Sequence, residues 1–180
     1  EGVRQGALYA KTELKSKNVD VEYIGFTKVD HRLEDTIIEK IENNYDGIIF
    51  PGFVVGGEKF VKMANSKNIA VMAFNCDFAE GVDRIAYFGP DIYASGRLAG
   101  EAIANALNDE GQIAIIRGPL ETSINRVRRD AIYEVVNKKK KMKMAAEIEA
   151  ETDNSKVYKN TMEALNKFHN LSGIVILTGG

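Results

Sequence analysis

Four polar segments follow apolar runs of the sequence, and they hold the side chains best suited to chemistry. These segments are Asn75-Cys76-Asp77, Arg117 to Arg126, Thr152-Asp153-Asn154 and Thr178-Gly179-Gly180. Their amides, carboxylates and hydroxyls and the guanidinium of Arg126 can form hydrogen bonds with the hydroxyl groups of a small polar ligand. Glycines at the end of a strand allow the backbone itself to approach such a ligand closely.

Each apolar run predicts a buried strand, so each polar segment falls at the carboxyl end of a strand, where open parallel sheets bind ligands. Arg126 falls in the first turn of a predicted helix, where a cation opposes the helix dipole. Its planar guanidinium can donate hydrogen bonds to two neighbouring hydroxyls of a ligand, which would explain an arginine at this unfavourable position. Structural roles remain open as alternatives: turn residues at Asn75 and Asp77, a helix cap at Ser123, another at Asp153 or Asn154, and a plain surface position for Arg126.

Motifs that would indicate catalysis are missing from the sequence. There is no GxGxxG after a strand, no GxxxxGK[ST], no GxSxG and no HExxH. His31 and His169 fall in a charged loop and at a helix end, where we expect surface positions. Cys76 has no histidine near it in the sequence to act as a general base. We therefore expect no catalytic residue, no metal site and no cofactor, and an enzyme on a Rossmann-like sheet is the less favoured alternative.

Composition narrows the class of protein further. The 180 residues include 24 Lys and Arg against 26 Asp and Glu, a balance that predicts no direct nucleic-acid contact from this segment. The single cysteine excludes an internal disulfide, and no apolar stretch is long enough to cross a bilayer. The run Lys138 to Lys141 follows a predicted helix, where cations favour the dipole.

Strands and helices alternate along the whole chain. Strands are predicted at 19–26, 47–50, 69–74, 84–88, 112–117, 142–148 and 173–177, and helices at 3–15, 32–43, 58–66, 92–107, 124–137 and 155–168. Such alternation predicts right-handed crossovers and parallel sheets, hence an α/β fold. The break at Gly89-Pro90-Asp91 favours two sheets. Both ends fall inside a repeating unit, so we expect a fragment, truncated at both ends.

The order of these motifs resembles the type 1 periplasmic-binding-protein family, which includes ribose-type sugar-binding proteins of ABC importers and the effector domains of LacI-type repressors. The likeness rests on segments in order along nearly the whole chain: Gly2 to Ala7, Tyr45 to Ile49, Ile69 to Asp77, Gly96 to Glu101 and Ile113 to Arg126.

The resemblance implies two Rossmann-like lobes, residues 1–90 and 91–180, that close on a ligand like a hinge. It also implies that Arg126, within Thr122 to Arg126, grips a sugar from the second lobe. Asn75-Cys76 stands where ribose-type proteins have Asp-Arg, with Asp77 next. Asp153 falls near an aromatic position of the family, and Gly179 falls near an asparagine.

The function that follows from the resemblance is non-enzymatic binding of a monosaccharide or related sugar as the solute-binding component of an importer. Candidate ligand-binding residues are Asn75, Cys76, Asp77, Ser123, Arg126, Asp153 and Gly179. An importer permease would be the partner, and the location would be extracytoplasmic, either periplasmic or lipid-anchored at the cell surface. The alternative is a cytoplasmic LacI-type effector domain, whose partners would be a DNA-binding headpiece and a second subunit.

Overall fold

The computed structural model describes residues 2–26, 31–43, 45–54, 56–120, 122–150 and 154–177. These residues form an α/β protein with parallel sheets flanked by helices, as the sequence predicts. The chain divides into two compact units, residues 1–39 and 40–180, which are described in turn. No helix within the described ranges is both long enough and apolar enough to cross a membrane.

Residues 1–39 contain helix α1 (Gly2–Leu14), a 3-10 turn (Lys15–Lys17) and most of α2 (His31–Glu42). The predicted helix at 32–43 is confirmed as α2, and its Leu33 and Ile37 are buried. The predicted strand at 19–26 is wrong, because this segment enters neither sheet. Alternation of apolar and polar residues does not make a strand without a neighbouring strand to share its hydrogen bonds.

The first sheet of the second unit has the order β1-β2-β3, with β1 at Gly47–Pro51, β2 at Ala70–Phe74 and β3 at Ala86–Phe88. All its pairs are parallel, and the register sets Pro51 opposite Phe74 and Phe74 opposite Phe88. The three strands therefore end at the same edge. Helix α3 (Gly57–Ser66) packs on β2 and buries Phe60 and Val61.

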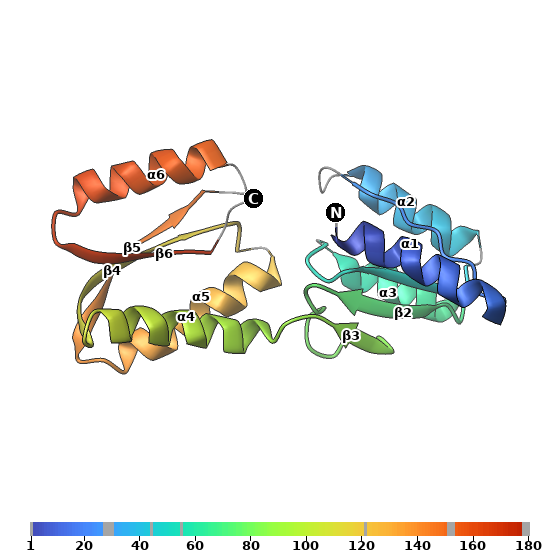
Figure 1. Ribbon diagram of the computed structural model, residues 1–180, viewed down its shortest axis with the longest axis horizontal. Helices are drawn as coiled ribbons and strands as arrows, with labels where there is room; N and C mark the ends of the chain where they lie inside the picture. The colour runs from blue at the N-terminus through green and yellow to red at the C-terminus, as the bar shows by residue number, and fades with distance from the viewer. Residues whose placement is uncertain are drawn as a thin grey trace. The chain divides into compact units, whose positions relative to one another are not determined.

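The second sheet has the order β5-β4-β6, with β4 at Glu110–Arg117, β5 at Lys141–Glu149 and β6 at Leu171–Ile176. Helices α4 (Ile92–Ala106) and α5 (Ser123–Asn137) cover one face, and α6 (Asn154–Lys167) lies on the other (Figure 1). The run Ile113 to Ile116 in the central strand is fully buried on both faces, as a parallel strand between two helical layers requires.

Close packing of α4 on α5 depends on two glycines. A side-chain carbon on Gly96 would lie 2.6 Å from the carbonyl oxygen of Arg128, and one on Gly100 would lie 3.0 Å from Cβ of Val135. The two helices are therefore nearly in backbone contact. Asp91 caps α4 by accepting a hydrogen bond of 2.8 Å from the backbone amide of Ala94.

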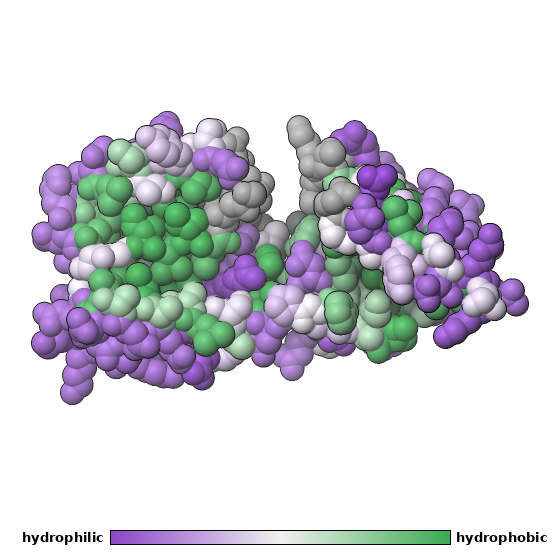
Figure 2. Space-filling view, viewed as in Figure 1, coloured by the Kyte–Doolittle hydropathy of each residue, from purple (hydrophilic) through white to green (hydrophobic). Residues whose placement is uncertain are grey.

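Strand β6 lies at the edge of the second sheet, with Ile176 half exposed. Figure 2 shows apolar side chains gathered on this side of the unit, between α6 and α4. The half-buried Ile103, Leu107 and Val175 pack there against the core of the sheet. The two predicted sheets are thus confirmed, while the lobe boundary at residue 90 stays a prediction.

Candidate ligand-binding site

The segment after β2 turns sharply, and Asn75 makes that turn possible. Its φ of 63° lies in the left-handed region, which asparagine adopts more readily than most residues. The backbone amide of Asn75 donates to the carbonyl of Phe88 (3.0 Å), and the Tyr87 hydroxyl donates to the carbonyls of Asn75 (3.2 Å) and Pro90 (2.7 Å). The turn leaves Asn75 exposed and buries the next residue, Cys76.

Both carboxylate oxygens of Asp77 accept hydrogen bonds from the guanidinium of Arg84. The Arg84 Nε–H donates to Oδ1 of Asp77 at 2.6 Å, and a terminal nitrogen of the same guanidinium donates to Oδ2. The backbone amide of Phe78 also donates to Oδ1 (2.9 Å). The hydrogen bond to Asp77 raises the pKa of Arg84 further above its usual range. Asp77 is therefore an ion-paired carboxylate held in one orientation. Arg84 was not among the predicted site residues because it lies seven residues farther along the chain.

Gly52 supports this turn from the end of β1. Its backbone amide donates to the carbonyl of Cys76 (2.8 Å), and a side-chain carbon at this position would lie 2.6 Å from that same oxygen. Only glycine leaves room for the approach. The segments after β1 and β2 are thereby held together beneath Asn75 and Asp77.

Cys76 and Ser123 join two of the predicted polar segments. The Cys76 Sγ lies 3.3 Å from the Ser123 Oγ, within hydrogen-bond range for sulfur. Burial raises the pKa of the Cys76 thiol, although the hydrogen bond with Ser123 works in the opposite direction. A thiol with a raised pKa stays protonated at neutral pH, so Cys76 packs and hydrogen-bonds here as a neutral group.

The start of α5 differs in one detail from the expectation. Ser123 is the first helical residue and Thr122 occupies the N-cap, so the predicted capping role of Ser123 is wrong. The Thr122 hydroxyl instead donates to the carbonyl of Pro119 (2.8 Å), which fixes the preceding loop. Arg126 lies in the first turn, as predicted. Its side chain is exposed, and one of its guanidinium nitrogens donates to the carbonyl of Leu120 (3.1 Å).

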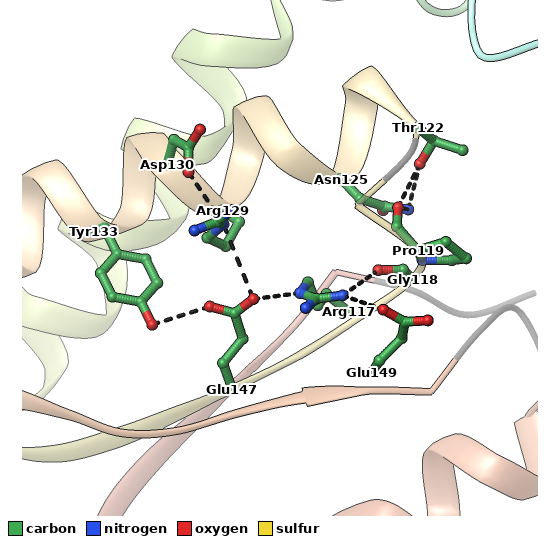
Figure 3. Close-up of polar contacts among 10 residues, drawn as sticks. All are labelled: Arg117, Gly118, Pro119, Thr122, Asn125, Arg129, Asp130, Tyr133, Glu147 and Glu149. Atoms are coloured by element: carbon green, nitrogen blue, oxygen red, sulfur yellow. Dashed lines mark hydrogen bonds and ion pairs between the residues drawn. The ribbon is translucent and has the colours of Figure 1, made fainter. Parts of the chain in front are cut away.

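An ion-pair network anchors the carboxyl ends of β4 and β5 (Figure 3). Arg117, only 11% exposed, donates to Glu147, to Glu149 (2.7 Å) and to the carbonyl of Gly118 (3.0 Å). Tyr133 donates a hydrogen bond of 3.0 Å to the other oxygen of Glu147. Burial alone would raise the pKa of Glu147, but the hydrogen bonds from Arg117 and Tyr133 outweigh it and lower that pKa.

This network escaped the sequence analysis, although a signal for it exists. Glu147 and Glu149 are two residues apart on β5 and so share one face of the sheet. The strand register places Glu149 opposite Arg117 and Glu147 opposite Ile115. An arginine at the end of one strand and alternating glutamates at the end of its neighbour therefore indicate such a pair once the strands are aligned.

Of the seven predicted ligand residues, five lie in the described part of the chain. Asn75, Cys76 and Asp77 share one turn, and Ser123 meets Cys76. Asp153 and Gly179 lie outside the described residues. Among the described residues no three His, Cys, Asp or Glu side chains gather as a metal site requires.

A profile of the family described as "Periplasmic binding protein domain" matches residues 5–180, and the chain belongs to that family. Among solved structures, the chain is similar to GanP, a glucose–galactose binding protein from Geobacillus stearothermophilus. That match has 27% identity and a TM-score of 0.84, and it covers 97% of this chain and 61% of GanP.

Two further solved structures are similar. A solute binding protein of an ABC transporter from Bacillus halodurans C-125, with bound myo-inositol, shares 25% identity at a TM-score of 0.81, covering 94% of this chain and 60% of that one. A solute binding protein from Burkholderia graminis C4D1M, in complex with D-arabinose, has the same fold at 23% identity and a TM-score of 0.81, covering 94% and 59%. The chain thus spans about 60% of the length of these proteins. No curated protein matches it.

Proposed function

We propose that this chain binds a monosaccharide or a related polyol, without catalysis, as part of the extracytoplasmic solute-binding component of an ABC-type importer. Family membership and the sugar or polyol ligands named for similar structures support this class of ligand. The main support for the location of the site is the Cys76–Ser123 contact, because it joins the polar turn after β2 to the start of α5.

Binding in this proposal uses exposed donors on both sides of that contact. The amide of Asn75 and the guanidinium of Arg126 are exposed and can donate to ligand hydroxyls. Asp77, held by Arg84, offers a fixed carboxylate edge. In the predicted arrangement of lobes 1–90 and 91–180, a ligand that contacts both segments favours the closed state and shifts the population toward it.

A thermal-shift screen of the full-length protein tests the proposal. The ligands are pentoses, hexoses, inositols and nucleosides, and the variant is Arg126→Ala. A ligand that binds the native state raises the Tm by mass action. We expect a shift with at least one saccharide or polyol, and we expect Arg126→Ala to lose it.

Arg97→Ala is the matched control, because Arg97 is an exposed arginine on α4 whose partner is Glu101 on the same helix. It should keep the full ligand-induced shift. No shift with any compound would overturn the proposed ligand class, and an unchanged shift in Arg126→Ala would remove Arg126 from the site.

A LacI-type effector domain remains the alternative host for the same site. It would give the same ligand-induced Tm shift, but it would also require a DNA-binding segment in the same protein. Titration of the full-length protein with an importer permease in vesicles separates the two hosts, because only the solute-binding component should bind the permease.

A further inference from the structure

Three consecutive backbone carbonyls after β4 are each held by a side chain of the same region. Arg117 donates to the carbonyl of Gly118 (3.0 Å). Asn125 donates to the carbonyl of Pro119 (3.0 Å), and Arg126 donates to that of Leu120 (3.1 Å). These contacts fix the course of the loop 118–120 from the end of the strand to the beginning of α5.

Asn125 is the central member of this set. It is 8% exposed and is the one buried polar side chain among the described residues. Its Nδ2 also donates to the Thr122 hydroxyl (2.7 Å), which itself donates to the carbonyl of Pro119 (Figure 3). The amide therefore closes a ring of hydrogen bonds between the loop and the first turn of the helix.

Gly118 leaves the space that this amide fills. A side-chain carbon on Gly118 would lie 2.6 Å from Nδ2 of Asn125, well inside the contact distance of real atoms. The loop and the amide therefore fit only when residue 118 has no side chain. This gives a second, independent way to disturb the position of the amide without changing Asn125 itself.

We propose that Asn125 is a positioning residue of the ligand site: its amide holds the loop 118–120 against α5 and so sets where Ser123 and Arg126 lie. The ligand part of this inference rests on the proposed function. The side chain of Asn125 is buried and would not touch a ligand itself. It would affect binding through the positions of Ser123, which is half-buried, and Arg126, which is exposed.

The first test needs no ligand and uses the thiol of Cys76. Its sulfur lies 3.3 Å from Ser123 Oγ, so displacement of the first turn of α5 should uncover it. The full-length protein is treated with iodoacetamide, and modification of the Cys76 peptide is followed by mass spectrometry. Asn125→Leu removes the donor at similar volume, and Gly118→Ala displaces the amide. We expect at least fivefold faster modification in both.

Val136→Ala is the control for general loss of stability. Val136 lies in the same helix but packs in the core formed with Ile113 and Ile132. For the same loss of Tm, Val136→Ala should raise the rate of Cys76 modification far less than Asn125→Leu and Gly118→Ala do. The double variant Asn125→Leu with Gly118→Ala should react no faster than Asn125→Leu alone. Rates equal to those of Val136→Ala would overturn the positioning role, and if Asn125→Leu fails to fold, Gly118→Ala decides.

The second test measures affinity for the saccharide found in the screen, by calorimetry. We expect Asn125→Leu and Gly118→Ala to weaken binding at least tenfold while Val136→Ala binds like the parent. If the parent binds no saccharide, the proposed function fails and the thiol rates alone decide the role of Asn125. If the parent binds and all variants bind equally, the positioning role fails while the proposed function stands.

Discussion

Arg84 donates to both carboxylate oxygens of Asp77 and so fixes the polar turn after β2 from the segment that leads into β3. The two side chains are about one-third exposed, at 33% and 29%. A bidentate ion pair of this kind fixes the orientation of the carboxylate as well as compensating its charge, because the two parallel hydrogen bonds require the guanidinium and the carboxylate to be coplanar. Asp77 is therefore presented in one orientation.

We expect Arg84→Lys to lose about as much unfolding free energy as Arg84→Gln does, although it keeps the positive charge. A lysine offers a point charge in place of the planar fork, so it cannot restore the two parallel hydrogen bonds. Because the pair is partly exposed, each variant should lose no more than about 1 kcal/mol of unfolding free energy in urea titrations. Full stability in Arg84→Lys would show that charge alone is sufficient.

Gly52→Ala should destabilise the protein by about 1–3 kcal/mol, the usual cost of overpacking. The new methyl group would lie 2.6 Å from the carbonyl oxygen of Cys76, so the turn that carries Asn75 and Asp77 must move. Gly47→Ala, at the start of β1, is the control, since the nearest neighbour of its added carbon would be 3.5 Å away. Equal urea midpoints for the two variants would contradict the close approach at Gly52.

Gly96→Ala should destabilise the α4–α5 pair more than Gly100→Ala. The carbon added at Gly96 meets the backbone of Arg128, which cannot yield without moving α5, whereas at Gly100 the nearest atom belongs to the side chain of Val135. Gly6→Ala in α1 is the control, because nothing lies within 4 Å of the added carbon. That variant should gain up to about 1 kcal/mol from helix propensity. Thermal unfolding of the three variants gives the order, and a Gly96→Ala variant as stable as the parent would refute it.

Glu147→Gln should reduce the dependence of stability on acidic pH. The pKa of Glu147 is lower in the folded protein than its ordinary value of 4.5, so the unfolded chain binds more protons between these two values. The contribution of Glu147 is thus present above pH 4.5 and is lost as the pH falls through the folded pKa. Urea midpoints should differ between parent and variant at pH 7 and converge below pH 4.5.

The matched control for this pH dependence is Glu101→Gln, which removes an exposed partner of Arg97 on the surface of α4. It should shift the urea midpoint little at either pH. A gap between the parent and Glu147→Gln that stays constant down to the acid-unfolding region would contradict the lowered pKa.

Much of the fold could be predicted from local patterns. The apolar run Ile113 to Ile116 predicted a buried parallel strand, and the structure buries every residue of it. Leu33, Ile37 and Ile41 recur at the four-residue spacing of one helix face, and all three are buried on α2. The segment 19–26 shows the limit of this approach, because a strand depends on a neighbour that alternation within the segment does not encode.

The candidate site could be predicted only where its residues directly follow strands. Asn75, Cys76 and Asp77 were found in this way, since the carboxyl end of β2 places them together. Arg84 and Asn125 were missed because their roles depend on contacts across a turn: Arg84 reaches back to Asp77, and Asn125 reaches back to Pro119. Such pairing is fixed by the course of the loops, which the spacing of residues in the sequence does not reveal.

The tight α4–α5 pair has a mechanical consequence. Helix α4 begins at Ile92, after Gly89-Pro90 and its cap Asp91. Near its start Ser95 accepts a hydrogen bond of 3.0 Å from Arg128 of α5. We therefore expect α4 and α5 to move together as one rigid pair that begins after Gly89-Pro90. A rotation at Gly89-Pro90 would therefore displace the C-terminal end of α5 more than Ser123, since a helix of 15 residues is about 22 Å long. A probe at Lys138 would report such a rotation more strongly than a probe at Ser123.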